Sequence, residues 1–465
     1  MYQNVNKKLK QLPFEYQELD ISGVREQFLK SEKTIVVLDD DPTGTQTCYD
    51  VTVLTGWDVE LIQEELEKKP SILFILTNSR SLSEPDAIKL ATEIGRNLKK
   101  AGEKSGREMI VISRSDSTLR GHFPAEVDAV ASALDMTEAV TVLIPAFLEG
   151  GRYTIDDIHY IAEKEELVPV SDTPFARDVV FGYQHADLKK WVEEKTRGRV
   201  RASQVSSISI EDIREGGPER VSEKLIACKQ GATCIMNAAS YRDLEVIAMG
   251  LMQAESAGKK LVYRTSATIV PIRAGLQSGK IYQPQHAVFR VGHLVIVGSH
   301  VPKTTSQLSW LLKQGDYKSI EVNVADILEA EEISLKAEAI VQQTDGWIAG
   351  GKNVVIHTSR RLEAGNDPES SLKINAIVSD FLVSLVKGLT VRPKFIVAKG
   401  GITSSDLATK GLSAQKALIL GPVIPGVPVW QMDEKSKFPG IIYVVFPGNV
   451  GDEQALLEVC KKFEG

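Results

Sequence analysis

Short apolar runs rich in β-branched residues recur along this chain, and they alternate with longer stretches in which apolar residues return at helical spacing. Runs of about four to eight such residues are typical of buried strands. We predict strands at 34–38, 51–54, 72–77, 109–113, 141–146, 294–299, 354–359, 395–398 and 441–446. In 85–100 and 371–387 the apolar side chains recur three or four residues apart, which predicts amphipathic helices.

This alternation indicates an α/β fold in which mostly parallel sheets are flanked by helices. The chain has 465 residues, more than one domain usually contains. The strand-like runs form two groups, and the segment between them, 185–285, is less clearly patterned. We therefore expect two α/β domains, 1–280 and 281–465, with a cleft between them.

Some of the predicted strands run directly into polar or glycine-rich segments. In open α/β sheets, ligands bind beyond the carboxyl ends of the strands. The segments are DDDPTGTQT (39–47), SRSDSTLRG (113–121), GSHVPKTTSQ (298–307) and KGGITSSD (399–406). Two of them lie in each predicted domain, so the sequence places one candidate site in each.

The first of these segments begins with three consecutive carboxylates, Asp39, Asp40 and Asp41. Adjacent carboxylates repel one another unless a cation, a hydrogen-bond donor or solvent compensates. Pro42 should turn the chain, and Gly44 should permit unusual backbone dihedrals. A carboxylate fixed in this turn could accept the proton of a substrate hydroxyl or bind Mg²⁺, whereas a solvated acidic turn would do neither.

Side chains suited to a small anionic polyol follow other predicted strands of the N-terminal half. Guanidinium groups bind carboxylates in a bidentate manner, and hydroxyl, amide and acid groups bind substrate hydroxyls. The candidates are Asn78, Arg80, Arg114, Asp116, Ser117, Arg120 and Arg152. Their recurrence at successive strand ends favours a ligand site over isolated helix caps and surface pairs.

Glycine turns join strands to helices in the C-terminal half. Gly400 and Gly401 permit close approach of the backbone, and Thr403 could cap a helix or bind phosphate at its positive end. Two further turns of this kind contain Ser299, Thr304 and Gly448. The spacing is not that of a Walker A motif, so binding of nucleotide phosphates and plain turn chemistry both remain open.

Composition narrows the possible functions. There are 55 Lys and Arg against 62 Asp and Glu, a formal charge of −7, which argues against binding of nucleic acid or of anionic membranes. The apolar runs are too short to span a bilayer, and the polar first residues lack a signal-peptide pattern, so we expect a cytoplasmic protein. Neither the cysteines nor the histidines have the spacing of a metal site.

The acidic turn also permits a second interpretation. The spacing of Asp39, Asp41 and Thr43 after an apolar strand fits the nucleophile loop of haloacid-dehalogenase-like phosphotransferases. There the first aspartate is phosphorylated and the second serves as acid and base. Our alternatives are therefore an aspartyl-phosphate phosphatase using Asp39 and Asp41, or a catalytically silent ligand-binding protein.

Taken together, the segments resemble the four-carbon acid sugar kinase family. The family's ADDxTG, KxDSTxRG and GR motifs are matched at 39–44, 114–121 and 151–152, and its GSxSxxTxxQ, GGxTS and GNxG motifs at 298–307, 400–404 and 448–451. The matches follow the family's order over nearly the whole chain. Arg114 stands where the family usually has lysine, and Ile402 replaces an acidic residue, which marks a divergent branch and allows a different acid substrate.

The resemblance implies a sugar-acid-binding N-terminal domain and an ATP-binding C-terminal domain. It implies transfer of the γ-phosphoryl group of ATP to a hydroxyl of a tetronate-like acid, with Mg²⁺ as cofactor and Asp40 or Asp41 deprotonating that hydroxyl. The polar candidates of the N-terminal half would hold the acid. The ATP-binding residues would be Ser299, Thr304, Gly400, Gly401, Ile402, Thr403 and Gly448. A homodimer is expected only because such assemblies are common.

Overall fold

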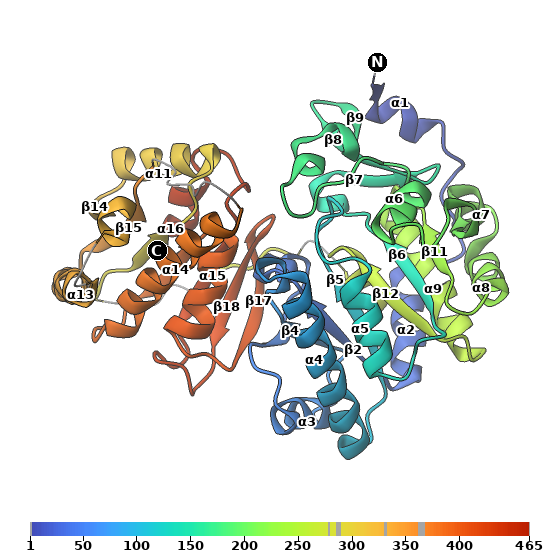
Figure 1. Cartoon of the computed structure of the whole chain (residues 1–465), viewed down its shortest axis with the longest axis horizontal. Helices are drawn as coiled ribbons and strands as arrows, with labels where there is room; N and C mark the ends of the chain where they lie inside the picture. Colours follow the sequence, from blue (N-terminus) through green and yellow to red (C-terminus); the bar gives the residue numbers. More distant parts are fainter. Residues whose placement is uncertain (1, 278–279, 285–289, 330–332, 361–367, 465) are drawn as a thin grey trace. The chain divides into compact units, whose positions relative to one another are not determined.

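The computed structural model describes residues 2–277, 280–284, 290–329, 333–360 and 368–464. They form two compact units (Figure 1), of which the first contains Met1–Thr47 and Gly56–Gly279 and the second Cys48–Thr55 and Lys280–Gly465. The short segment Cys48–Thr55 therefore belongs to the second unit, although in the sequence it lies between the two parts of the first. The boundary predicted at residue 280 adjoins residues 278–279, which lie outside the described part of the chain.

A parallel sheet forms the framework of the first unit. In spatial order its strands are β10 (Ser206–Ile208), β11 (Thr233–Met236), β6 (Val140–Ile144), β12 (Leu261–Thr265), β5 (Met109–Arg114), β2 (Thr34–Asp39) and β4 (Ile72–Leu76). All neighbours in this order run parallel. Every residue of β2 is buried, because helices cover both faces of the sheet, and this explains its continuous apolar run.

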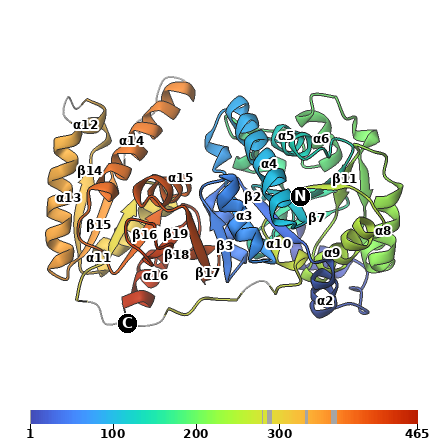
Figure 2. The ribbon, with the colours of Figure 1, turned by 90° about the horizontal axis from the view of Figure 1, so that it is seen from below.

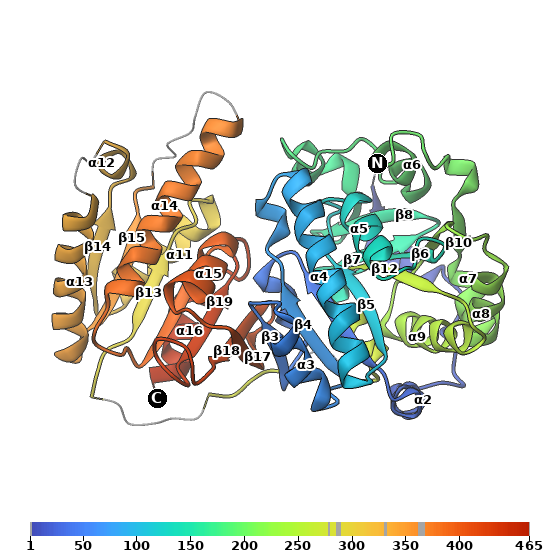
Figure 3. The same cartoon turned by 60° about the horizontal axis from the view of Figure 1, so that its bottom comes forward.

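Helices pack on both faces of this sheet. The helices of this unit are α1 (Val5–Lys10), which adjoins the strand β1 (Gln3–Asn4), α2 (Ile21–Ser31), α3 (Val59–Glu67), α4 (Glu84–Ser105), α5 (Ala125–Ala133), α6 (Leu188–Lys195), α7 (Ile210–Arg214), α8 (Gly217–Ala227), α9 (Tyr241–Ser256) and α10 (Ile269–Arg273). The α3, α4 and α5 helices form one layer, and α2, α8, α9 and α10 form the other (Figure 2). Figure 3 shows α4 and α5 side by side in front of the strands.

A small antiparallel sheet, which the sequence pattern did not predict, follows β6. It consists of β1 (Gln3–Asn4), β9 (Glu166–Pro169), β8 (Ile158–Glu163) and β7 (Arg152–Ile155) in that spatial order. Thr154 in β7 forms backbone hydrogen bonds with Ala238, just beyond β11. The small sheet is thus attached at the carboxyl edge of the parallel sheet, where Arg152, the first residue of β7, can face a ligand.

The second unit has a mixed sheet. In spatial order its strands are β3 (Val51–Leu54), β17 (Lys416–Ile424), β18 (Val427–Met432), β19 (Ile442–Phe446), β16 (Phe395–Lys399), β13 (Leu294–Val297), β15 (Asn353–Thr358) and β14 (Tyr317–Val322). The strands from β19 to β14 are parallel, and the others pair antiparallel. The helices are α11 (Pro302–Gln314), α12 (Val324–Leu328), α13 (Ile333–Ala349), α14 (Pro368–Gly388), α15 (Gly401–Asp406) and α16 (Ala455–Glu464).

The fold class is confirmed: two α/β domains, each with a mostly parallel sheet flanked by helices. All the predicted strands are present, and 85–100 and 371–387 lie in α4 and α14. The segment 185–285, which the pattern left undefined, supplies β11 and β12 to the interior of the first sheet. Within the described ranges, no helix combines the length and the apolar composition that crossing a bilayer requires.

Candidate functional site

Polar side chains from separate strands meet at the carboxyl edge of the sheet in the first unit. The last residue of β2, Asp39, is paired in register with Arg114 of β5, which is paired in turn with Thr265 of β12. Because parallel strands end at the same edge, the segments after them come together although they are distant in the sequence. The predicted convergence of strand ends is therefore present in this unit.

Asp40 lies at the centre of this cluster, and its side chain is 3% exposed. Arg80 donates from Nη2 to Oδ1 at 2.7 Å and from Nε to Oδ2 at 3.2 Å. Arg114 lies 3.4 Å from Oδ1, and the Ser115 hydroxyl donates to Oδ2. Burial alone would raise the pKa of Asp40, but Arg80, Arg114 and Arg264 lower it overall. Asp40 is thus a firmly held, ionised carboxylate.

The neighbouring aspartates differ from Asp40 in their access to solvent. Asp39 is fully buried and accepts a hydrogen bond from Arg114 at 2.8 Å. Burial raises the pKa of Asp39 to about 7, although Arg114 acts in the opposite direction. The side chain of Asp41 is 20% exposed, and its Oδ2 lies 3.5 Å from Nη1 of Arg80. Asp41 is therefore the most accessible carboxylate of the three.

Gly44 packs directly against the ion pair between Asp39 and Arg114. A Cβ atom at this position would lie 2.3 Å from both carboxylate oxygens of Asp39 and 2.5 Å from Cζ of Arg114. Gly44 lies in a 3₁₀ turn, Pro42–Thr47, and is not among the glycines with positive φ. The expectation of an unusual dihedral was therefore wrong, and glycine is needed here for close approach.

A second ion-paired group lies in the loop after β5. Nε of Arg120 donates to Asp116 at 2.7 Å, and Nη1 of Arg120 lies 3.5 Å from Asp178. Burial alone would raise the pKa of Asp116, but Arg120 and Arg80 hold it well below its ordinary value. Asp116 therefore stays ionised, and its charge links this group electrostatically to Arg80.

Arg152 adds an incompletely paired guanidinium to the same edge. Its Nη1 donates to the backbone carbonyl of Gly150, and its Cζ lies 5.7 Å from the centre of the Phe147 ring. Its Nε atom is buried and has no hydrogen-bond partner among the described residues. A buried donor without a partner is costly, so this nitrogen suits an acidic ligand.

The two remaining predicted residues of this half, Asn78 and Ser117, shape the cluster through their backbone atoms. Asn78 adopts a left-handed conformation with φ of 49°, and its amide nitrogen donates to the carbonyl of Asp39 at 3.4 Å. This turn leads into Arg80. The carbonyl of Ser117 lies 2.7 Å from Nε2 of the buried His159, which fixes the loop that carries Asp116.

Sequence reasoning missed three residues of the cluster: Ser115, Arg264 and Glu126. Nη2 of Arg264 donates to the carbonyl of Arg120 at 3.0 Å, and its Nη1 is buried without a hydrogen-bond partner among the described residues. Glu126 of α5 is 7% exposed, and burial, reinforced by the charge of Asp40, raises its pKa to about 7. The arginine inside the apolar run 261–265 was the available signal for Arg264.

In the second unit, the turns after β13, β16 and β19 meet. The Thr304 hydroxyl donates to the carbonyl of Gly448 at 2.8 Å and lies 3.2 Å from Oγ of Ser299. A Cβ atom on Gly298 would lie 2.1 Å from Oγ1 of Thr403, and one on Gly448 would lie 2.8 Å from Oγ of Ser299. Of the residues predicted in this half, Ser299, Thr304, Thr403 and Gly448 thus lie in these adjoining turns.

The turn that contains Gly400 and Gly401 needs a backbone conformation that favours glycine. Gly400 has φ of 125°, a conformation that favours glycine, and α15 begins at Gly401. Ile402 is 46% exposed. The hydroxyl of Ser404 donates to the carbonyls of Ala398 and Gly400, so it serves the turn itself.

Two cations that the sequence analysis did not select lie at these turns. Lys399 is completely buried, its Nζ donates to the carbonyl of Pro447 at 2.6 Å, and it lies 4.0 Å above the Phe446 ring. Burial, with a contribution from Lys303, lowers the pKa of Lys399 to about 7. Arg360 donates to the carbonyl of Ser299 at 2.7 Å. The turns are therefore surrounded by positive charge, which suits an anion.

No three His, Cys, Asp or Glu side chains group to hold a metal ion in the described part of the chain. The described residues therefore do not fit a site that would bind Mg²⁺ by protein ligands alone. Mg²⁺ is, however, often held by only one or two carboxylates together with substrate phosphates. The use of Mg²⁺ therefore remains a prediction.

Each of the two units matches the model of a known domain family. Residues 35–272 match the family model of a sugar-binding N-terminal domain, and residues 294–456 match that of a nucleotide-binding C-terminal domain. The chain belongs to the four-carbon acid sugar kinase family.

Curated relatives match part of the chain. A D-erythronate kinase of Heliobacterium modesticaldum is 27% identical over 224 residues, 46% of this chain and 47% of the relative. A D-threonate kinase of Bordetella bronchiseptica is 29% identical over 154 residues, 31% of this chain and 36% of the relative. The chain thus spans about half and about a third of these two relatives.

Solved structures share the fold over a longer span. One, described as a putative tRNA synthase from Salmonella typhimurium, has a TM-score of 0.67 at 18% identity and covers 92% of this chain and 99% of that chain. A Haemophilus influenzae protein has a TM-score of 0.62 at 17% identity and covers 92% and 100%. At these identities the likeness concerns the fold alone.

Proposed function

We propose that this protein is a kinase that transfers the γ-phosphoryl group of ATP to a hydroxyl of a four-carbon sugar acid. The observation that carries the proposal is the cluster of Asp40, Asp41 and Arg80 at the edge of a sheet whose family model is sugar-binding. The names of the relatives, D-erythronate kinase and D-threonate kinase, support the class of acceptor.

The acceptor acid would bind among the arginines of the first unit. Its carboxylate would accept hydrogen bonds from Arg152, whose Nε has no partner among the described residues, and from Arg120. Its hydroxyls would meet Asp116 and Asp41. Charge-assisted hydrogen bonds of this kind fix orientation as well as affinity, which is the main requirement of phosphoryl transfer.

Asp41 is our candidate for the general base. Asp40 already accepts hydrogen bonds from Arg80 and Ser115, whereas the more exposed Asp41 has an oxygen beside Arg80. In the proposed step, the acceptor oxygen forms a bond to the γ-phosphorus and its proton passes to Asp41. The bond from the γ-phosphorus to the bridging β–γ oxygen breaks, and ADP leaves.

The donor triphosphate would bind at the turns of the second unit. The hydroxyl of Ser299 lies close to the turns that contain Gly400 and Gly448, and Lys399 supplies nearby positive charge. Transfer also requires that the γ-phosphate and the acceptor hydroxyl come within bonding reach. The proposed step uses only the groups of this chain and its two substrates, because the described side chains form no group of three that would hold Mg²⁺.

The geometry favours this proposal over an aspartyl-phosphate phosphatase. That mechanism needs Asp39 as an accessible nucleophile, but Asp39 is fully buried and paired with Arg114 at 2.8 Å. A covalent phosphoryl group would have no room there, because Gly44 already packs against both oxygens.

A screen of ATP consumption tests the proposal. The purified protein would be incubated with ATP, Mg²⁺ and a panel of four-carbon sugar acids, with longer and shorter acids as controls, and products would be identified by mass spectrometry. The expected result is ADP and one phosphorylated acid in equal amounts, formed only when the acid is present. Hydrolysis of phosphate monoesters without nucleotide would support the phosphatase instead, and binding of ATP or an acid without turnover would indicate a silent binding protein.

A further inference from the structure

The parallel sheet of the first unit is split between two adjacent strands. β5 pairs with β2 along its whole length, from Met109 opposite Thr34 to Arg114 opposite Asp39. Its pairs with β12 begin only at Ile112 opposite Tyr263. β12 pairs with its other neighbour, β6, from Leu261 onward. The amino ends of β5 and β12 therefore diverge, while their carboxyl ends remain joined.

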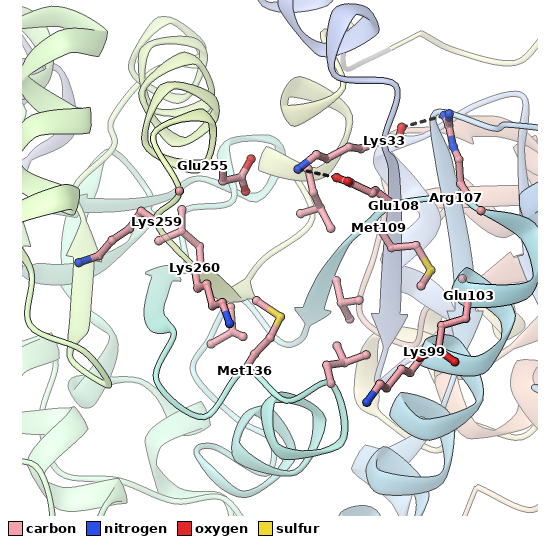
Figure 4. Close-up of a pocket in the computed structure, with 18 residues that line it drawn as sticks. Lys33, Lys99, Glu103, Arg107, Glu108, Met109, Met136, Glu255, Lys259 and Lys260 are labelled. Atoms are coloured by element: carbon pink, nitrogen blue, oxygen red, sulfur yellow. Dashed lines mark hydrogen bonds and ion pairs between the residues drawn. The ribbon is translucent and has the colours of Figure 1, made fainter.

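A cavity of about 530 Å³ occupies this split (Figure 4). The residues at the amino ends of both strands line it with apolar side chains. They are Met109, Ile110, Val111, Leu261 and Val262, with Leu134 and Met136 from the segment after α5. This volume falls in the range of about 300–1,000 Å³ that is common for small-molecule sites. Backbone groups along the diverging edges also lack ladder partners and are available to a ligand or to water.

Charged side chains surround the opening. Figure 4 shows Lys33, Glu108 and Glu255 on one side and Lys99 and Lys260 on the other. Most of these charges have partners: Lys33 pairs with Glu108 at 3.1 Å, Lys99 pairs with Asp135, and Glu255 pairs with Arg273. Lys260 forms no ion pair with any residue that the structure describes. Arg107 and Lys259 also line the cavity without an ion pair among the described residues, as does the acidic Glu103, so basic side chains outnumber acidic ones in the lining. An apolar interior with this excess of positive charge suits an amphipathic anion.

We propose that the split between β5 and β12 is a second binding site, which takes a small amphipathic anion. The apolar body of the ligand lies against Met109, Val111 and Leu261, and its carboxylate, sulfonate or phosphate meets Lys260. This site is at the amino edge of the sheet, opposite the cluster around Asp40, and it does not depend on the proposed kinase activity. The strands that form its walls lead to Arg114 and Arg264, so a ligand there contacts strands that position the acceptor cluster.

Titration of the full-length protein with 8-anilinonaphthalene-1-sulfonate tests this site. The probe has a flat apolar body and one sulfonate, and its fluorescence reports an apolar environment. We expect saturable binding of one probe per chain. Lys260→Glu should weaken binding about tenfold, since it replaces an attraction by a repulsion. Lys100→Glu makes the same change of charge at an exposed position of α4 outside the cavity. It should change the dissociation constant of the probe by no more than about twofold.

Two further measurements test whether the probe binds in the cavity between β5 and β12. Met136→Trp should fill the cavity and abolish binding without moving the thermal midpoint by more than about two degrees, because Met136 is only partly buried and the larger ring would extend into the cavity. Hydrogen exchange with the probe bound should slow at 109–112 and 260–263. The proposal is overturned if the probe does not bind, if Lys260→Glu and Lys100→Glu weaken it equally, or if protection appears only elsewhere.

Discussion

The guanidinium of Arg80 holds both carboxylate oxygens of Asp40, at 2.7 and 3.2 Å, while its third nitrogen lies 3.5 Å from Asp41. One cation thus connects two adjacent carboxylates that would otherwise repel each other. The bidentate contact fixes Asp40. Asp41 accepts a hydrogen bond from the backbone nitrogen of Thr43 at 2.8 Å through Oδ1, whereas its Oδ2 has only the longer contact with Arg80. This asymmetry is the reason for proposing Asp41, and not Asp40, as the general base.

Asp41→Asn is expected to lower kcat for phosphoryl transfer by about a thousandfold, because an amide cannot accept the proton of the attacking hydroxyl. The dissociation constant of ATP should stay within about twofold, since the change lies in the other unit. Steady-state kinetics and calorimetric titration with ATP would measure the two quantities.

Asp316→Asn is a matched control for this variant, because Asp316 is exposed and belongs to neither cluster. Retention of more than about a tenth of the activity in Asp41→Asn would exclude it as the general base. A much larger loss in Asp40→Asn under the same conditions would assign that role to Asp40.

Arg152→Met is expected to raise KM for the sugar acid by about ten- to a hundredfold, because the partly buried guanidinium would no longer meet the substrate carboxylate. The KM for ATP should not change. Arg197→Met, at a side chain that is 87% exposed, serves as the control. An unchanged KM for the acid in Arg152→Met would remove this residue from the acceptor site.

Gly298→Ala is expected to weaken ATP binding at least about tenfold, because the new methyl group would lie 2.1 Å from Oγ1 of Thr403. Either the turn after β13 or the one after β16 must then move. In the double variant Gly298→Ala/Thr403→Ala the overlap is smaller, so thermal stability should recover while ATP affinity stays low. Fluorescence titration and thermal melts separate these effects, and normal ATP affinity in Gly298→Ala would contradict the proposed donor site.

Much of the framework could be predicted from the sequence, because buried parallel strands have continuous apolar runs. β2 and β16 are examples: every residue of each is buried, and polar residues begin only where the strand ends. The candidate residues at these ends could be selected for the same reason. Contacts such as that between Arg80 and Asp40 depend on the strand order, which a single sequence does not display.

Residues whose role depends on burial were harder to select. Glu126 lies in a helix where an acidic residue is ordinary, and only packing under Asp40 distinguishes it from a surface glutamate. Lys399 ends an apolar strand, where a lysine usually reaches solvent, yet here it bonds Pro447. The β3 strand was correctly predicted, but its antiparallel partner, β17, is more than 300 residues away in the chain. No local pattern predicts such a pairing.

Glu126→Gln is expected to change the pH dependence of stability. The pKa of Glu126 is raised to about 7 in the folded protein, so between about pH 4.5 and 7 the folded state binds more protons than the unfolded state. The free energy of unfolding of the wild type should therefore fall as pH rises through this window. Glutamine does not titrate, so the variant should gain about 1–3 kcal/mol relative to wild type by pH about 8 and nothing below pH about 4.

Urea unfolding at several pH values, followed by circular dichroism, would measure this difference for Glu126→Gln. Glu138→Gln, at an exposed glutamate just beyond α5, should show no such trend. If the advantage of Glu126→Gln were the same at every pH, its origin would be packing, and the buried charge would play no part.

Lys399→Met is expected to weaken ATP binding in a pH-dependent way. Burial lowers the pKa of Lys399 to about 7, so its ammonium is charged below that pH and largely neutral above it. Other cations at these turns, Lys303 and Arg360, are present in wild type and variant alike. Removal of the Lys399 charge should raise the ATP dissociation constant about tenfold at pH about 6 but only about twofold at pH about 9.

The comparison with arginine distinguishes charge from packing at this position. Lys399→Arg keeps a charge at both pH values, so its ATP affinity should fall less between them than that of the wild type. Lys313→Met on α11 removes an exposed charge and should have no effect at either pH. An equal loss of affinity at both pH values in Lys399→Met would mean that the side chain acts only through its hydrogen bond to Pro447.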